Sequence, residues 1–180
     1  CYVAGMGTLF PGETGEALKA SMKTAYSPAR TLGYNVARDT LYAIVDRNAE
    51  GKVAGIYTGF EVAYSEGNPR SVLFAGGINA EHTWPQSMGA GDEPQKSDMH
   101  FVFPSKINVN SERGSYPFAE IPDSQTRSWF RGNEISSSIP TSDINEYSEY
   151  VSGRFEPRES VKGDMARAVF YFNTIYSSAA

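Results

Sequence analysis

The chain has 180 residues, enough for one domain over residues 1–180 with a real hydrophobic core and too few for two comfortable ones. Its net charge of −5 argues against a protein that coats nucleic acid by bulk electrostatics, because such proteins present a broad basic face. No apolar run reaches the roughly 20 residues that cross a bilayer, and the lone Cys1 has no partner for an intrachain disulfide, so we expect neither a membrane span nor a disulfide framework.

Helical periodicity marks the N-terminal part of the chain. Residues 14–26 begin with a threonine that can cap a helix and carry apolar residues at helical spacing, so a first helix is predicted there and interpreted as scaffold. A second helix is predicted over residues 35–45, with Leu41, Ile44 and Val45 on its inward face.

The middle of the chain favours strands. β-Branched and aromatic residues over 53–64 predict one strand, turn formers over 65–70 follow it, and residues 72–74 predict another strand. Residues 98–103 alternate enough for a short strand, and a proline opens residues 104–113, which are predicted to form a helix. The expected result is a two-stranded ribbon next to a helix.

The C-terminal part divides into an irregular stretch and a helix. Residues 115–150 scatter serine, proline, aspartate and asparagine, which predicts loops and short turns. Residues 160–177 are predicted to form a helix whose inward stripe is Met165, Val169, Phe172 and Tyr176. That stripe is interpreted as core, and the chain as a mixed α+β domain.

The chain has only two histidines, and one of them, His82, directly follows Glu81. An imidazole with an ordinary pKa of about 6.5 can take a proton from water near neutral pH, and a carboxylate beside it can hold a hard cation. The pair by itself is a weak signal, since a single histidine is more often a structural residue. On the expected fold, Asn110 projects from the helix beside the ribbon that carries His82.

Three longer strings strengthen this signal: EHTWPQS, SDMHFVFPSKINVNSERGSYPF and FEPRESVKGDMARAVFYF. Together they closely resemble the bacterial endonuclease I family of periplasmic and secreted nucleases, within the His-Me finger or ββα-metal group. Residues 2–18 and 56–58 are also similar to that family, so the resemblance spans nearly the whole chain. It implies a fold built around a ββα-metal motif with additional helices, and a secreted or periplasmic location.

The resemblance also implies roles for three residues. The family's general base matches His82, and its two protein ligands for the metal match Glu81 and Asn110. These oxygen ligands suit Mg²⁺, with Mn²⁺ or Ca²⁺ as alternatives. The implied reaction is sequence-nonspecific hydrolysis of DNA, and of RNA too, to a 5′-phosphate and a 3′-hydroxyl. No obligate protein partner is evident.

Two arginines in the same strings are candidates for gripping a phosphate during catalysis. Arg113 follows Asn110 by three residues on the same side of the expected helix, and Arg167 lies in KGDMAR. The alternative for Arg113 is a contact that anchors the helix end or a loop. The alternative for Arg167 is a buried ion pair, with Glu156 or Asp164.

Neighbouring residues have simpler interpretations. Asp98 is expected to cap a turn or strand end, or to stiffen the site by accepting a hydrogen bond. His100 is expected to be partly buried with satisfied partners, and Trp84 to pack in the core. Several members of the family carry many disulfides and a basic residue in the loop between the ribbon strands, whereas here that loop offers only Lys96.

Two other functions stay open at this point. The chain could be a catalytically degenerate nuclease fold that serves as a binding module of an exported protein, although a pure scaffold would not need Glu81, His82 and Asn110 together. It could also be a phosphodiesterase for small substrates, for which the acidic charge matters less.

Overall fold

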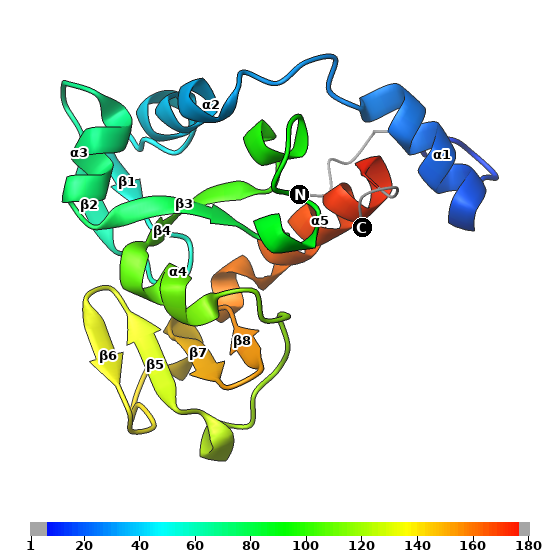
Figure 1. Cartoon of the computed structure of the whole chain (residues 1–180). Coiled ribbons are helices and arrows are strands. Elements are labelled where there is room, and N and C mark those ends of the chain that lie inside the picture. The colour runs from blue at the N-terminus through cyan, green and yellow to red at the C-terminus, as the bar shows by residue number, and fades with distance from the viewer. Residues whose placement is uncertain (1–6, 177–180) are drawn as a thin grey trace.

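Helices and small antiparallel sheets alternate along the chain in this computed structural model, which describes residues 7–176 (Figure 1). This mixture confirms the predicted α+β class. Cys1 and Ser177, the predicted end of the last helix, lie outside the described residues. Within those residues, no helix is both long and apolar enough to cross a membrane.

The α-helices are α1 (Gly15–Tyr26), α2 (Tyr34–Thr40), α3 (Pro69–Ala75), α4 (Ile107–Arg113) and α5 (Glu159–Ile175). The strands are β1 (Lys52–Ala54), β2 (Glu61–Ala63), β3 (Ile78–His82), β4 (Val102–Lys106), β5 (Ser128–Arg131), β6 (Glu134–Ser136), β7 (Ser148–Val151) and β8 (Arg154–Glu156).

A ribbon of two antiparallel strands, β3 and β4, lies at the centre of the structure and is followed directly by α4 (Figure 1). The register pairs Ile78 with Lys106 at one end and His82 with Val102 at the other. Helix α4 packs against both strands. The ribbon precedes the helix, as the sequence predicted, but its first strand, β3, lies at residues that were not predicted to form a strand.

Pro104 lies inside β4, opposite Ala80, so the prediction that it opens the helix is wrong. Within its sheet, β4 pairs with β3 on one side only, and a proline is tolerated in an edge strand because no partner needs its missing N–H. The carbonyl of Pro104 accepts a hydrogen bond from the N–H of Ile56 at 2.8 Å. Helix α4 begins at Ile107 instead.

The predicted single strand over residues 53–64 is a hairpin of two shorter strands, β1 and β2. A tight turn separates them: the N–H of Gly55 donates to the carbonyl of Phe60 at 2.7 Å, and Gly59 has a φ of +68° that a side chain would disfavour. The apolar run is long because it contains both strands and a turn whose Tyr57 is fully buried.

The predicted strand at residues 72–74 is wrong, because these residues belong to helix α3. Asn68 caps this helix by accepting a hydrogen bond from the N–H of Ser71 at 3.1 Å, and Pro69 occupies its first turn. The residues interpreted as turn formers are therefore a helix start, and this capping outweighs the strand propensity of Val72.

Residues 115–150, predicted to be irregular, contain most of a four-stranded antiparallel sheet with the order β6-β5-β7-β8. Its strands are three or four residues long, so none is long enough to show a clear alternation. Trp129 and Phe130 on β5 are almost fully buried. The sheet depends on pairing between separate segments, which local patterns do not reveal.

Helix α5 runs past both apolar clusters of the molecule. In the predicted stripe, Met165, Phe172 and Tyr176 are buried, and Val169 is half-buried. Met165 packs in a cluster with Phe130 of the four-stranded sheet, whereas Phe172 packs in the cluster that includes the ribbon. Trp84 stacks on Phe172 with ring centroids 4.8 Å apart, which confirms that Trp84 packs against the core.

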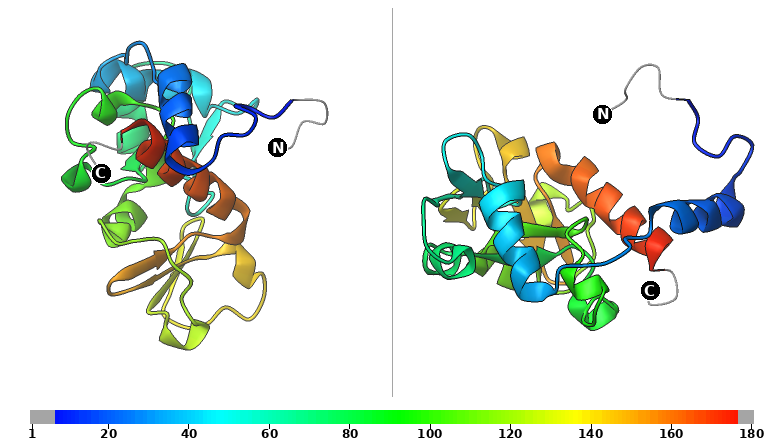
Figure 2. Two further views of the ribbon diagram at one scale, coloured as in Figure 1. Left: turned by 90° about the vertical axis from the view of Figure 1, so that its right-hand side faces the viewer. Right: turned by 90° about the horizontal axis from the view of Figure 1, so that it is seen from above.

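Helix α1 ends at Tyr26 as predicted and lies at the edge of the molecule, in contact with α5 (Figure 2). Thr14 takes the N-cap position, but its side chain makes no capping hydrogen bond. None of the residues of α1 is buried: Leu18 and Met22 are half-buried and Ala25 is exposed. This peripheral position agrees with its interpretation as scaffold.

Helix α2 continues as a π-helical turn over residues 41–45, which confirms a helix where one was predicted. The wider turn changes which residues face inward. Leu41 and Tyr42 are buried, whereas Ile44 and Val45 are 73% and 57% exposed, so the prediction that these two face inward is wrong.

Candidate active site

Four of the five residues singled out by the sequence line one cleft of about 350 Å³, where β3 meets α4. These four are Glu81, His82, Asn110 and Arg113. Glu81 and His82 end β3, while Asn110 and Arg113 belong to α4. Because α4 packs against β3, residues from two separate segments meet at one place.

Arg167 does not line this cleft. It lies exposed on α5, and its guanidinium forms an ion pair with Asp164 on the same helix. The ion pair with Asp164 is therefore present, but the expectation that it is buried is wrong, because the side chain of Arg167 is 68% exposed.

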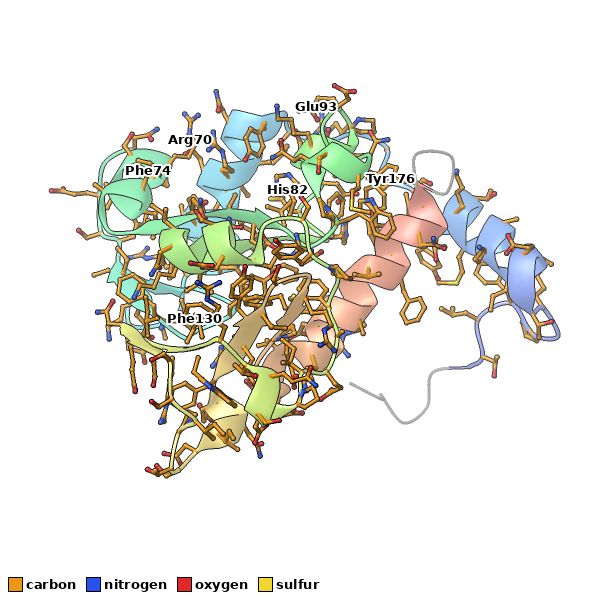
Figure 3. All side chains as sticks on the ribbon, turned by 60° about the horizontal axis from the view of Figure 1, so that its bottom comes forward. Arg70, Phe74, His82, Glu93, Phe130 and Tyr176 are labelled. Atoms are coloured by element: carbon orange, nitrogen blue, oxygen red, sulfur yellow. The ribbon has the colours of Figure 1, made fainter. Side chains whose placement is uncertain are left out.

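His82 is 5% exposed, and both of its ring nitrogens have a partner (Figure 3 labels its position). Nε2 lies 3.0 Å from the carbonyl oxygen of Lys96, in the loop between β3 and β4. A carbonyl can only accept, so Nε2 carries the hydrogen and Nδ1 is unprotonated in the neutral ring. Nδ1 in turn accepts a hydrogen bond from the side-chain amide of Gln86 at 3.2 Å.

The surroundings of His82 keep its ring neutral and in a fixed orientation. Burial lowers its pKa, the nearby charges of Lys96 and Arg38 lower it further, and the bond to the Lys96 carbonyl opposes them. The ring packs against Tyr34 and Phe101, with centroids 5.7 and 6.1 Å away. A neutral imidazole with an unprotonated Nδ1 is the form that can accept a proton.

Glu81 is 2% exposed and is held by two neighbours. Its Oε1 accepts a hydrogen bond from the Tyr57 hydroxyl at 2.6 Å and lies 3.3 Å from Nε of Arg113. Burial raises the pKa of Glu81 to about 7, although Arg113 and the bond from Tyr57 both act to lower it. A buried carboxylate of this kind gains strongly from an additional positive charge.

Asn110 presents its side chain to β3 in one orientation. Its Nδ2 donates to Oδ1 of Asn79 at 2.8 Å and to the carbonyl of Ala80 at 3.2 Å. Neither bond uses Oδ1 of Asn110, so the oxygen is the part of this amide that can bind a cation.

Arg113 is buried, and its guanidinium donates to backbone carbonyls. Nη1 donates to Gly114 at 3.0 Å and Nη2 to Thr83 at 2.7 Å, while the guanidinium carbon lies 4.7 Å from the ring centroid of Phe118. These contacts tie the end of α4 to the end of β3. They correspond to the anchoring alternative for this residue.

Two residues that contact the site had no role in the sequence analysis. Tyr57 reaches Glu81 from the turn between β1 and β2, and nothing in the local pattern around either residue predicts their contact. Gln86 lies in the string EHTWPQS, four residues after His82, so the string pointed to its segment but not to its bond with Nδ1.

Asp98 connects the loop before β4 to the C-terminal helix. It accepts hydrogen bonds from the hydroxyls of Tyr171 and Tyr176 at 2.8 and 2.7 Å, in addition to the expected turn-capping bond from the N–H of His100. The side chain of His100 is 64% exposed, so the expectation that it is partly buried is wrong. Its Asp98 contact and its stacking on Tyr171 do satisfy it.

A group of carboxylates outside the cleft consists of Glu120, Glu156 and Glu159, with oxygen atoms within 4.8 Å of one another. Nζ of Lys162 lies among them, 2.8, 2.6 and 2.5 Å from one oxygen of each. The Lys162 ammonium holds the three carboxylates together, so this is a salt-bridge cluster, with more negative than positive charge.

Known proteins resemble this chain over most of its length. The family described as Endonuclease I matches residues 14–180. An extracellular ribonuclease of Bacillus amyloliquefaciens is 30% identical over 169 residues, which are 92% of this chain and 51% of that protein. An extracellular ribonuclease of Bacillus subtilis (strain 168) is 29% identical over 168 residues, with the same coverage of 92% and 51%. The chain therefore spans about half the length of these curated relatives.

Proposed function

The chain belongs to the endonuclease I family, a family of nuclease enzymes, and from this premise we propose that it is a metal-dependent, sequence-nonspecific endonuclease. The observation that carries the proposal is the state of His82. Its Nε2 hydrogen is committed to the Lys96 carbonyl, which leaves the unprotonated Nδ1 to act in the cleft that Glu81 and Asn110 also line.

In the proposed reaction, Nδ1 of His82 takes a proton from a water molecule while the water oxygen forms a bond to phosphorus. The bond from phosphorus to the 3′-oxygen then breaks, and the 3′-oxygen gains a proton from solvent. The products carry a 5′-phosphate and a 3′-hydroxyl. A general base placed in this way contributes roughly 10²–10⁴-fold to the rate. Because Gln86 now donates to Nδ1, its amide must yield that position to the water.

The chemistry of Glu81 and Asn110 fits a hard divalent cation. Both residues line the cleft, and the amide hydrogens of Asn110 are turned toward β3. Burial raises the pKa of Glu81 even beside Arg113, so a further positive charge would stabilise its carboxylate. When bound there, Mg²⁺, with Mn²⁺ or Ca²⁺ as alternatives, supplies charge that stabilises the phosphate and the leaving oxygen.

The two arginines receive different places in this proposal. Arg113 is a positioning residue, because it pairs with Glu81 and holds the carbonyl of Thr83 just after β3. Arg167 is left out of the reaction, since it is exposed on α5 and does not line the cleft.

We propose DNA as a substrate, and RNA as well, because two relatives are named extracellular ribonucleases. The same names support a secreted or periplasmic location. With a net charge of −5, the chain is expected to hold its substrate through local contacts and the metal, so its activity should favour moderate salt.

The test is plasmid cleavage by the purified chain with Mg²⁺, with EDTA, and with the His82→Ala variant. His100→Ala is the matched control, because it changes the other histidine, which is exposed and lies outside the cleft. We expect cleavage only with metal, a rate lower by roughly 10²-fold or more for His82→Ala, and a nearly unchanged rate for His100→Ala.

Other outcomes of this test would select the alternatives. An intact plasmid in every lane, across Mg²⁺, Mn²⁺ and Ca²⁺ and a range of salt, combined with turnover of a small phosphodiester, would identify a small-substrate phosphodiesterase. No turnover of either substrate would leave a nuclease fold that serves only for binding.

A further inference from the structure

An apolar groove of about 710 Å³ lies beside the cleft, between α5 and the segment that follows α4. Three residues line both the groove and the cleft: Pro85, Arg113 and Ser115. The groove volume lies within the range of roughly 300–1,000 Å³ that is typical of sites for small organic groups. A molecule with a phosphate in the cleft can therefore extend an adjoining group into the groove.

The walls of this groove are apolar and partly aromatic. Tyr116 and Phe118 line it from the segment after α4, and Val169 and Phe170 line it from α5. Phe170 is 72% exposed, and Met88, another lining residue, is 51% exposed. A nucleobase suits such walls, because its flat face stacks on aromatic side chains in proteins that bind single strands.

The charges along the groove favour a neutral base over a phosphate. Lys162 lines the groove, but its ammonium is shared by three carboxylates, so this cluster carries more negative than positive charge. Arg113 is buried and donates to backbone carbonyls. These two cations are therefore committed to contacts inside the protein, while a neutral ring meets no repulsion from the acidic cluster.

We propose that this groove is a subsite for an unpaired nucleobase next to the scissile phosphate, which makes single-stranded nucleic acid the preferred substrate. The inference rests on the proposed function, because it needs a phosphodiester in the adjoining cleft. Bases paired in a duplex face its interior and can enter the groove only if they are flipped out. Stacking also needs no basic surface, which is consistent with a chain whose net charge is −5.

The test uses single-stranded DNA oligonucleotides in which one natural phosphodiester is surrounded by methylphosphonate linkages, so that the cleaved bond is known. In two matched oligonucleotides, the base on the 5′ side or on the 3′ side of that bond is replaced by an abasic residue. A complementary strand, annealed to the oligonucleotide that carries all its bases, gives the duplex substrate.

Two variants change the groove, and a third variant serves as a control. Phe170→Ala removes the exposed ring, and Ala166→Phe narrows the groove from an exposed position on the same helix. Phe74→Ala is the matched control: Phe74 is also an exposed helical phenylalanine, at 64%, but it lies on α3, across the molecule from α5 (Figure 3).

We expect wild-type protein to cleave the single strand faster than the duplex. Both groove variants should raise KM for the base-bearing strand by about 5-fold or more, as loss of one stacking contact does. They should leave KM unchanged for one of the two abasic strands, and Phe74→Ala should change none of these values. Two results with an active wild-type protein would overturn the inference. In the first, the groove variants raise KM equally for the base-bearing strand and both abasic strands. In the second, they change KM for none of the strands.

A wild-type protein that cleaves no strand with any of the three metals would instead overturn the proposed function. Binding of the same oligonucleotides in EDTA, followed by fluorescence anisotropy, would then decide whether the groove holds a base. Weaker binding of one abasic strand, and equally weak binding of the base-bearing strand by Phe170→Ala, would support the groove. Equal binding of all strands by both proteins would reject it.

Discussion

The ββα unit, which consists of β3, β4 and α4, and the four-stranded sheet are both built from short strands, but only the ββα unit places its buried titratable groups in the cleft. Where β3 meets α4, three buried side chains are charged or titratable, namely Glu81, His82 and Arg113, and each has specific partners. The sheet buries the rings of Trp129, Phe130 and Phe155, and its two buried carboxylates, Glu149 and Glu156, lie outside the cleft. Buried titratable groups that line a common cleft are typical of functional sites, so the candidate chemistry belongs to β3 and α4.

The sheet still contributes to the site, through a chain of hydrogen bonds. The hydroxyl of Ser148 on β7 donates to the carbonyl of Tyr57 at 2.7 Å, and the hydroxyl of Tyr57 donates to Glu81 at 2.6 Å. The Ser148 hydroxyl also accepts from the N–H of Arg158, just before α5. The sheet thus holds the residue that orients the candidate metal ligand, while offering none of the residues that line the cleft.

The largest effect that we predict separates the two candidate arginines by stability. Arg113→Met removes the partner of a buried carboxylate and should lower the free energy of unfolding by roughly 3 kcal/mol or more. Arg167→Met removes only an exposed pair and should change that free energy by less than about 0.5 kcal/mol. Chemical denaturation measures both, and equal losses in the two variants would contradict the anchoring role of Arg113.

The next effect separates metal-dependent cleavage from DNA binding. Asn110→Ala should lower the cleavage rate by roughly 10²-fold at low Mg²⁺, about 2.7 kcal/mol of barrier, because it removes a proposed oxygen ligand. Part of the loss should return at high Mg²⁺, while binding of DNA in EDTA should change little. Asn108→Ala is the control, since Asn108 is an exposed residue of the same helix. An unchanged Mg²⁺ titration for Asn110→Ala would exclude Asn110 as a ligand.

The smallest effect concerns a titratable group in the sheet. Burial raises the pKa of Glu149 to about 7, and the charges of Glu156 and Asp123 raise it as well, while the bond from Thr126 and the charge of Lys162 act in the opposite direction. A carboxyl whose pKa is raised in the folded state contributes stability below its unfolded pKa, and that contribution is lost as the pH rises through about 7.

Glu149→Gln should therefore stabilise the chain at pH 8, by about 1 kcal/mol or roughly 2–4 °C in Tm, and change little at pH 5. The glutamine can still accept the hydrogen bond from Thr126. Glu66→Gln, at an exposed position, is the control and should leave Tm unchanged at both pH values. A gain at pH 5 as large as the gain at pH 8 would mean that the effect does not come from titration of Glu149.

Local patterns were sufficient for the elements that depend on neighbours in the chain. Helices α1 and α5 follow from apolar residues at helical spacing, and most of the α5 stripe is buried as predicted. The same periodicity was misleading at Ile44, because a π-helical turn rotates the side chains that follow Thr40. Pattern rules failed again at residues 72–74, where a capping asparagine and a proline begin a helix.

By itself, the sequence determined the family resemblance, the mixed α+β class, and the set of Glu81, His82 and Asn110, whose roles are still predictions. Only the tertiary structure decided that Arg113 is buried against backbone carbonyls while Arg167 is exposed beside Asp164. It also decided that Tyr57 contacts Glu81, and that the strands of 115–150 form a sheet. The physical reason is that motifs and periodicity arise from residues close in the chain, whereas burial and hydrogen-bond partners depend on which distant segments pack together.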